Sequence, residues 1–338
     1  MDEKGERMQT TTLRRISAAL LGGALTTGLA LGATAQTALK FGHIVGTDHA
    51  IHIGATAMAE HVGACTGGAV KIDIFPGGQL GNEGALIDQT RLGAVDFANS
   101  GASFLARSLP ALGVSSLPYA FRNRDHAVAY GKSDVLRELM DGWEKAAGQM
   151  LLGAYYAGAF HIYAQDGFPT PETLKGRKIR VPDAPSWMVF YRAVGANPTP
   201  MALGEVYLGL RQGVIDGANL PLGVGFSLKM HEVSKVITMT FHQMEMAMLI
   251  TGQHLKRRLS PAHWACVEAG GKIYAAAAEK ETIRAEDALR KEMTDKNMIR
   301  FVDVDLAAYQ KATASIFEER VKSGEFTQAL VDRVRAIP

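Results

Sequence analysis

Arg180 is the residue whose chemistry is most constrained by its neighbours. It lies inside the apolar run KIRVP at residues 178–182, where a guanidinium must find a partner because an unpaired buried charge is costly. A carboxylate is the best partner, since the planar fork of arginine donors holds both oxygens at once. Two partners meet this need: an acid of the chain itself, in an internal salt bridge, or the carboxylate of a bound ligand.

Asp183 and Trp187 follow Arg180 closely and can contribute to the same site. The Asp183 carboxylate can accept a hydrogen bond from a ligand hydroxyl or amine, or it can cap the helix predicted to begin near Pro185. The Trp187 indole can form an aromatic wall of a binding site, or it can pack into the core from one face of that helix. The sequence leaves both pairs of alternatives open.

Three of the ten histidines lie near the end of the first predicted strand. His43 stands where α/β folds place ligand-contacting loops, although a buried core histidine would show the same pattern. His49 and His52 are one helical turn apart, a spacing compatible with metal binding. No third ligand is near them in the sequence, and Asp48 is well placed to cap the helix. We therefore expect no metal site.

Asn99 and Ser100 end the third predicted strand, at the carboxyl edge where ligands bind in α/β sheets. The sequence contains no G-x-S-x-G elbow, no H-E-x-x-H motif and no P-loop. The glycine-rich segment at residues 77–81 lacks the spacing of a dinucleotide-binding loop, so we expect a turn there. These observations predict a binding protein without a cofactor.

The N-terminal segment has the parts of an export signal. Arg14 and Arg15 precede an apolar run over residues 16–32, and residues 33–35 have the A-x-A cleavage pattern. We expect cleavage near Ala35 and location in the periplasm. The alternative, a membrane anchor, fits less well because the run is short, rich in glycine and followed by polar sequence.

The overall composition narrows the function further. The net charge is only +2, and basic residues are interspersed among acids, which argues against nucleic acid as a partner. Cys65 and Cys266 are the only two cysteines, too few for a metal cluster. In an oxidising compartment they can form a disulfide, and the sequence leaves the pairing open.

Alternating strand and helix patterns predict an α/β fold. Strands separated by helical stretches of this length form right-handed crossovers in a parallel sheet that is covered on both faces. We expect the chain to cross between two lobes near Gly158 and again near Glu245. The expected strands are at residues 39–44, 70–75, 95–99, 150–156, 161–164, 178–181 and 246–251, and the expected helices at residues 50–65, 81–92, 125–148 and 261–295.

Three segments resemble the signature regions of the solute-binding proteins of TRAP transporters, the DctP-type family. They are GRKIRVP, GANPTPMALGEVYLGLRQGVIDGANLP and FPGGQLGNEGALIDQTRLGAVDFANS, and the likeness covers nearly the whole chain after residue 38. It implies a two-lobed, type II-like periplasmic binding-protein fold with crossover strands and a long helix that spans both lobes. The expected lobes are residues 36–157 with 246–285, and residues 158–245 with 286–338.

The resemblance also suggests residues of the ligand site. Arg180 corresponds to the arginine of the family's RVP motif, which binds the ligand carboxylate. His43 is similar to a histidine that dicarboxylate-type members carry after the first strand, and His242 resembles a family histidine near the lobe crossing. Phe160 stands where some sialic-acid-binding relatives have a second arginine.

The chain departs from the family pattern at DGANLP, where many relatives have DGQENP. The family's ligand-contacting asparagine matches Leu220, so either the ligand is less polar at this point or Asn219 turns inward instead. Gly101 stands near a glutamate of sialic-acid-type relatives, which leaves no acid to bind polyhydroxyl groups. These departures predict a small or partly apolar mono- or dicarboxylate rather than a nine-carbon sugar acid.

The sequence therefore predicts an exported, monomeric receptor that delivers a small organic acid to the small and large membrane subunits of a TRAP transporter. We expect no enzymatic turnover. Three alternatives stay open: a receptor of an ABC importer, a sensory domain, and an exported enzyme that uses the same cleft.

Overall fold

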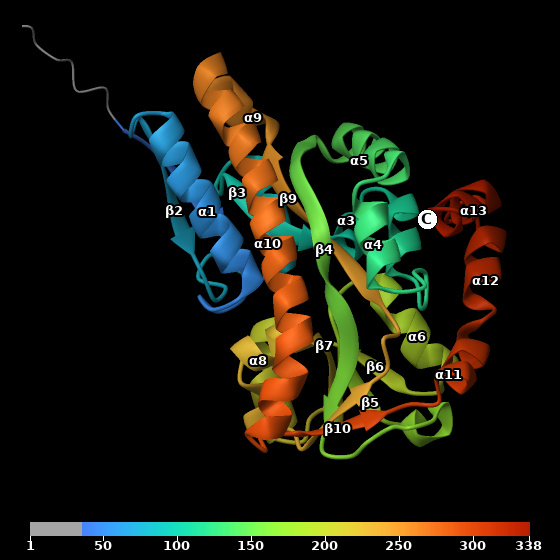
Figure 1. The fold of residues 1–338 in the computed structure, drawn as a ribbon. Coiled ribbons are helices and arrows are strands. Elements are labelled where there is room, and N and C mark those ends of the chain that lie inside the picture. Colours follow the sequence, from blue (N-terminus) through green and yellow to red (C-terminus); the bar gives the residue numbers. More distant parts are fainter. Residues whose placement is uncertain (1–35) are drawn as a thin grey trace, which may run out of the picture. The chain divides into compact units, whose positions relative to one another are not determined.

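A mixed β-sheet organises residues 36–338, the part of the chain that the computed structural model describes (Figure 1). The predicted export signal at residues 1–35 lies outside the described residues. Neighbouring strands follow the order β2-β1-β3-β9-β4-β7-β5-β6, while β8 pairs with β4 and β10. The strands are Thr37–Gly42 (β1), Val70–Phe75 (β2), Phe97–Gly101 (β3), Gln149–Ala164 (β4), Lys178–Val181 (β5), Asn197–Pro200 (β6), Gly217–Pro221 (β7), Val236–Met239 (β8), Met244–Gly252 (β9) and Arg300–Asp303 (β10).

The long strand β4 belongs to two parts of the sheet, which we call the first and second half-sheets. Up to Ala159 it pairs with β9, in the first half-sheet with β1, β2 and β3. From Phe160 onward it pairs with β7 and β8, in the second half-sheet with β5, β6 and β10. The two strands predicted at residues 150–156 and 161–164 are thus one continuous strand.

Gly158 lies at the point where β4 passes between the half-sheets. Its φ of 118° favours glycine, and a register shift separates it from Tyr156. Its partner across the ladder is Glu245, at the start of β9. The crossover strands expected near Gly158 and Glu245 are confirmed.

Alternation along the strands creates a core on each face of the sheet. In β9, Met246, Met248 and Ile250 point to one core, while Ala247 and Leu249 point to the other. Successive side chains of a strand face opposite sides, and both faces of this strand are buried, as expected for a sheet covered by helices. Two further cores cover the second half-sheet in the same way.

Helices cover both faces of the sheet (Figure 1). No helix within residues 36–338 combines the length and hydrophobicity needed to cross a bilayer. The α-helices are Ala50–Cys65 (α1), Glu83–Leu92 (α2), Ala102–Leu105 (α3), Arg124–Gly131 (α4), Asp134–Ala147 (α5), Met188–Ala193 (α6), Val206–Arg211 (α7), Leu222–Ser227 (α8), Gln253–Arg258 (α9), Pro261–Asp295 (α10), Leu306–Thr313 (α11), Ile316–Lys322 (α12) and Gln328–Arg335 (α13); short 3-10 helices include Pro110–Ser116 (η1) and Pro185–Trp187 (η3).

Two helix predictions differ from the structure. The single helix expected at residues 125–148 is wrong, because the chain forms α4 and α5 instead. Ser133 separates them: its Oγ accepts a hydrogen bond from the Leu136 backbone N–H at 3.2 Å and so starts a new helix. Asp48 does not cap α1, since the cap is His49, whose Nδ1 accepts from the Ile51 N–H.

The long helix expected at residues 261–295 is confirmed as α10, which extends along both half-sheets in Figure 1. Gly270 and Gly271 allow close packing of α10 against its neighbours. A Cβ at Gly271 would lie 2.6 Å from the Leu152 carbonyl oxygen of β4. A Cβ at Gly270 would lie 2.9 Å from the Val62 side chain of α1. The small residues therefore let α10 approach its neighbours.

A disulfide joins Cys65, at the end of α1, to Cys266 in α10. The two residues are 201 positions apart in the sequence, and their Cα atoms are 5.9 Å apart. The pairing that the sequence left open is therefore present, and it fixes two packed helices of the first half-sheet.

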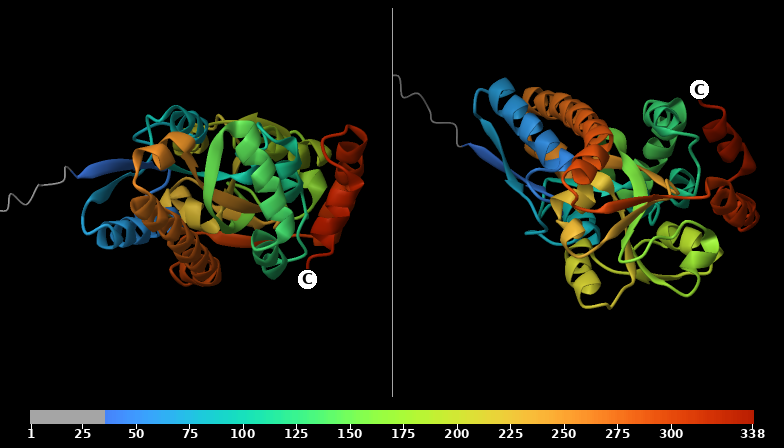
Figure 2. Two further views of the ribbon diagram at one scale, coloured as in Figure 1. Left: turned by 90° about the horizontal axis from the view of Figure 1, so that it is seen from above. Right: turned by 60° about the horizontal axis from the view of Figure 1, so that its bottom comes forward.

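The last two helices, α12 and α13, pack against the first half-sheet (Figure 2). Ile316 and Phe326, together with Val331 and Val334 of α13, belong to the core that also contains α4 and α5 residues. His126 in α4 contacts the Val334 carbonyl oxygen at 2.9 Å. The end of the chain thus packs beside elements that precede the first crossing.

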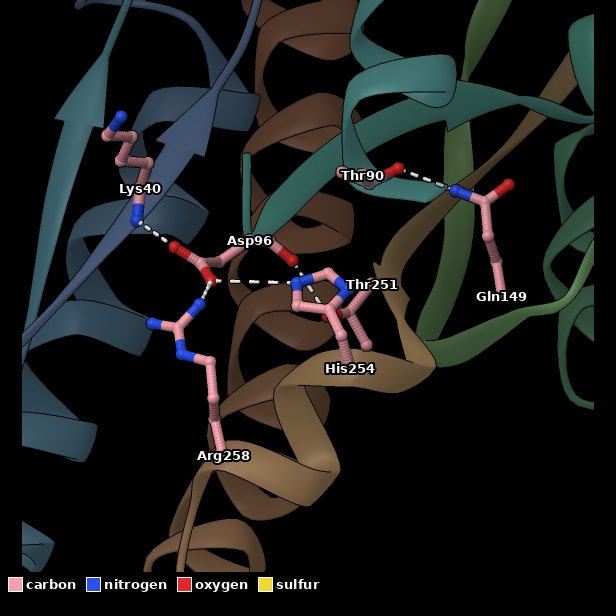
Figure 3. A network of polar contacts seen from close by, with 7 residues as sticks. All are labelled: Lys40, Thr90, Asp96, Gln149, Thr251, His254 and Arg258. Atoms are coloured by element: carbon pink, nitrogen blue, oxygen red, sulfur yellow. Dashed lines mark hydrogen bonds and ion pairs between the residues drawn. The ribbon is translucent and has the colours of Figure 1, made fainter. Parts of the chain in front are cut away.

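A polar network at the start of β3 fixes neighbouring elements of the first half-sheet (Figure 3). The buried Asp96 carboxylate accepts hydrogen bonds from the Lys40 backbone N–H at 2.7 Å and from Arg258 Nη1 at 2.8 Å. The Thr251 hydroxyl donates to the Asp96 carbonyl oxygen at 2.7 Å. None of these side chains lines the cavity described below, so their role is to position β1, β3, β9 and α9.

Candidate functional site

A cavity of about 820 Å³ is lined by residues of both half-sheets. Its walls come from the carboxyl ends of β1, β3, β5 and β7, from the segments that follow them, and from β4 and β9. This is where ligands bind in α/β sheets. Six of the eight residues proposed from the sequence line it: His43, Asn99, Phe160, Arg180, Asp183 and Trp187.

Arg180 is almost completely buried, with 3% of its surface exposed. Within residues 36–338 its guanidinium donates to two backbone carbonyls, Met201 at 3.0 Å and Asn219 at 3.3 Å. Burial lowers the pKa of Arg180 to about 10, against the opposing charges of Glu83 and Glu205. A guanidinium has five N–H donors, so three remain for a partner. The contacts are not those of an internal salt bridge.

Asp183 lies at the exposed rim of the cavity. Its carboxylate is 3.4 Å from Arg107 Nη2, in an ion pair whose side chains are 74% and 45% exposed. Arg107 also donates to the Asp183 backbone carbonyl. The residue does not cap the following turn, whose N-cap is Ala184 without a side-chain bond. The Arg107–Asp183 pair therefore connects the segment after α3 to the segment after β5.

Phe160 and Trp187 form an aromatic wall of the cavity. Their ring centroids are 4.4 Å apart, and both side chains are buried. The Trp187 Nε1–H donates to Ser103 Oγ at 2.8 Å, which fixes the indole against α3. Trp187 is thus both a core residue and a cavity residue, so the two alternatives for it are combined.

His43 lines the cavity and also contacts another histidine. Its Nε2 is 3.0 Å from His52 Nδ1, and burial, followed by the charge of His52, lowers the pKa of His43 to about 3. His49 does not join this pair, because it caps α1. Within the described residues, no three His, Cys, Asp or Glu side chains are grouped to hold a metal ion.

Asn99 is oriented by two tyrosines. Its Oδ1 accepts hydrogen bonds from the hydroxyls of Tyr155 at 3.0 Å and Tyr274 at 2.8 Å. Because the amide oxygen is occupied, the Asn99 NH₂ group is the part available to a ligand. Tyr155 also lines the cavity, whereas Ser100 does not.

The structure corrects two predicted site residues. His242 is fully buried outside the cavity lining, where it stacks on Phe190 at 4.1 Å and its Nδ1 contacts Thr240 Oγ1 at 2.7 Å. Asn219 is also fully buried outside the lining, and Leu220 lines the cavity instead. Successive strand residues face opposite sides, so the register of β7 turns the Asn219 amide away. It does not replace the family asparagine.

Glu83, Glu205 and Glu245 line the cavity in addition to Asp183, so the expectation that no acid remains there is wrong. Glu83, in the first turn of α2, accepts from the Gly101 N–H at 2.8 Å and from Ser100 Oγ at 2.9 Å. Glu245, 4% exposed, lies at the start of β9. The sequence held a signal for Glu245: like Arg180, it is a charge inside an apolar run, MEMAMLIT.

The pKa of Glu245 makes a test possible. Burial raises this pKa from 4.5 to about 7, although hydrogen bonds from Ser103 and Ser116 oppose the change. A carboxyl with a raised pKa stabilises the folded state below pH 4.5, and this contribution is lost as the pH rises toward 7. Glu245→Gln removes this titrating group. We therefore expect the slope of the free energy of unfolding against pH to differ between the two proteins by up to about 1.4 kcal/mol per pH unit.

Urea unfolding of both proteins at pH 5, 6, 7 and 8 measures this difference. Identical pH profiles would show that Glu245 titrates in its ordinary range. The pKa of Glu83 is also raised by burial, and its charge contributes to the raised pKa of Glu245, so the difference reports Glu245 together with its coupling to Glu83.

Comparison with known proteins agrees with this geometry. The model of bacterial extracellular solute-binding protein family 7, DctP, matches residues 41–323. The chain belongs to this family. The sequence resemblance and the α/β, two-lobed fold with crossover strands are confirmed, because solved TRAP periplasmic solute-binding proteins superpose on this family-7 chain over most of its length.

Three relatives illustrate the similarity of this family-7 chain. A solute-binding protein of Roseobacter denitrificans is 30% identical over 284 residues, 82% of this chain and 85% of the relative. Its crystal structure with bound L-galactonate has a TM-score of 0.81 and 26% identity, covering 89% and 98% of the two chains. A 2,3-diketo-L-gulonate-binding periplasmic protein of Escherichia coli is 32% identical over 242 residues, 69% and 72% of the two chains. A TRAP solute-binding protein of Polaromonas bound to D-erythronate has a TM-score of 0.84 and 26% identity, covering 89% and 99%.

Proposed function

We propose that this family-7 receptor binds a small organic acid whose carboxylate docks on Arg180. The observation that carries the proposal is a buried guanidinium at the cavity with three N–H donors not used by the two backbone carbonyls. A carboxylate satisfies such donors in bidentate geometry. The relatives described above with L-galactonate, D-erythronate and 2,3-diketo-L-gulonate support this choice, since each of these compounds carries a carboxylate.

Binding would close two lobes around the acid. Residues of both half-sheets line the cavity, and β4 and β9 connect the half-sheets beside Gly158, which suits a hinge. The ligand can shift the balance only by preferring the closed form. The lobes would be residues 36–157 with 246–285, and 158–245 with 286–315. We assign residues 316–338 to the first lobe, because α12 and α13 share its core.

The closed receptor would be recognised by the small and large membrane subunits of a TRAP transporter. It would act as a monomer in the periplasm, after removal of residues 1–35, and would release the acid chemically unchanged. The family match and the periplasmic relatives support this proposal over an ABC-importer receptor, a sensory domain or an enzyme.

A thermal-shift screen tests the proposed function. We expect stabilisation by at least one carboxylate among succinate, D-erythronate and L-galactonate, and none by the neutral sugar galactose. A ligand present at a hundred times its dissociation constant adds about 2.7 kcal/mol to the free energy of unfolding. Stabilisation by galactose but by no acid would contradict the proposal.

A further inference from the structure

Glu245 is held in one orientation by three hydrogen bonds. Its Oε1 accepts from the Ser103 backbone N–H at 3.0 Å and from Ser103 Oγ at 2.8 Å, and its Oε2 accepts from Ser116 Oγ at 3.1 Å. A carboxylate has about four acceptor positions, so one position on Oε2 remains. Because the side chain lines the cavity, this remaining acceptor would be available to a ligand that reaches Oε2.

The space for this carboxyl depends on Gly101. A Cβ at Gly101 would lie only 2.4 Å from Glu245 Oε1, closer than any real contact allows. The end of β3 therefore lacks a side chain where the Glu245 carboxyl needs room. The position of the carboxyl is built by three separate elements: β3, α3 and η1, which contribute Gly101, Ser103 and Ser116.

The aromatic wall adjoins this carboxyl. The Ser103 hydroxyl that donates to Glu245 also accepts from the Trp187 indole N–H at 2.8 Å. Phe160 packs on Trp187 and lines the same cavity. Aromatic faces suit C–H groups, whereas a carboxyl oxygen suits a hydroxyl donor. Together they match a carbon chain that carries hydroxyl groups.

Glu83, which also lines the cavity, carries a charge that acts on both Arg180 and Glu245. The positive charge of Arg180 counteracts the raised pKa of Glu83, and the negative charge of Glu83 contributes to the raised pKa of Glu245. Glu83 thus interacts with both groups. Glu83 also accepts a hydrogen bond from the Gly101 N–H at 2.8 Å, beside the Glu245 carboxyl, and Arg180, Glu83 and Glu245 all line the same cavity. A second carboxylate on the ligand would be repelled there wherever Glu83 and Glu245 are ionised.

We infer that Glu245 is a specificity-determining residue, which accepts a hydrogen bond from a hydroxyl group of the bound acid, remote from its carboxylate. The inference builds on the proposed function, because it takes Arg180 as the carboxylate anchor. It narrows the solute to hydroxylated monocarboxylates and disfavours dicarboxylates such as succinate.

Calorimetry on Glu245→Gln tests the inference with matched ligand pairs. The pairs are D-erythronate with its 4-deoxy analogue and L-galactonate with its 6-deoxy analogue, which differ only in the terminal hydroxyl. For the pair that binds the wild type, we expect the variant to lose about 10- to 100-fold in affinity for the hydroxylated acid, since hydrogen bonds to charged groups have this strength. Affinity for the deoxy analogue should change less than about threefold.

Glu286→Gln is the matched control. Glu286 is a partly buried carboxyl near the crossing, where it accepts from the Ala159 N–H at 2.7 Å and from the Tyr156 hydroxyl at 2.8 Å, but it does not line this cavity. Because Glu286 bonds Ala159 beside the proposed hinge, we expect the control to change both affinities of a pair by the same factor. Gly101→Ala, which displaces the Glu245 carboxyl without removing it, should reproduce the selective loss and serves if Glu245→Gln does not fold.

The outcomes separate the inference from the proposed function. Equal losses for both members of a pair would assign Glu245 a structural role and overturn the inference. Binding of succinate, with no binding of either hydroxylated acid, would overturn the inference while leaving the carboxylate receptor intact. Failure of every acid to bind would contradict the proposed function itself.

Discussion

Replacement of Arg180 by alanine is expected to weaken binding of the acid by a few hundred-fold or more. Removing one partner of a buried, hydrogen-bonded ion pair costs about 3–5 kcal/mol, because the other charge is left buried and unpaired. In this protein the ligand carboxylate would be that charge, since Arg180 is almost fully buried. Calorimetry with the acid that gives the largest thermal shift measures the change.

Arg180→Lys separates the positive charge from the donor geometry. Lysine keeps the charge but cannot hold two carboxylate oxygens in a planar fork, and it cannot reproduce the bonds to the Met201 and Asn219 carbonyls at once. We expect an affinity between those of the wild type and the alanine variant. Circular dichroism of both variants would show whether the fold is retained.

Arg107→Ala is the control for Arg180, because Arg107 lines the same cavity. Its ion pair with Asp183 is largely exposed, and exposed pairs contribute at most about 1 kcal/mol. We expect less than a tenfold loss of affinity. Unchanged affinity in Arg180→Ala, together with a large loss in Arg107→Ala, would move the anchor from the buried arginine to the rim.

Loss of the Cys65–Cys266 disulfide is expected to lower the free energy of unfolding by about 2–4 kcal/mol. The bond closes a loop of 201 positions, and a cross-link over a long loop restricts the unfolded chain strongly. The double variant Cys65→Ala/Cys266→Ala, compared with the wild type in urea, measures the difference. Adding a reducing agent to the wild type should produce a similar decrease.

Ligand affinity provides the control for the disulfide. Neither cysteine lines the cavity, so the folded double variant should bind the acid within about twofold of the wild type. Equal unfolding midpoints for oxidised wild type, reduced wild type and double variant would show that the bond contributes no stability. A loss of affinity without a loss of stability would instead connect α1 and α10 to the cavity.

Local sequence patterns predicted most strands and the longest helix. The apolar run at residues 70–75 corresponds to β2, and the helical pattern at residues 261–295 corresponds to α10. The prediction failed where one residue outweighed the pattern, as at Ser133, whose side chain starts a second helix. Periodicity averages over many residues, so it cannot show a single cap that interrupts it.

The candidate site could be predicted only in part. Arg180 was identified because a charge in an apolar run needs a partner, whether or not the fold is known. Glu245 carries the same signal but was missed, because its donors Ser103 and Ser116 are 142 and 129 positions away in the sequence. Asn219 and Leu220 are neighbours in the sequence, and only the register of β7 decides which one faces the cavity.

The sequence by itself determined the α/β class, the family and the buried arginine, because these depend on residue type and on short-range periodicity. The tertiary structure decided the composition of the cavity. It brought Glu83 and Glu245 into the lining, moved His242 into the core and joined Cys65 to Cys266. These contacts depend on how distant strands and helices pair, and each pairing sets which face of an element is turned to the cavity.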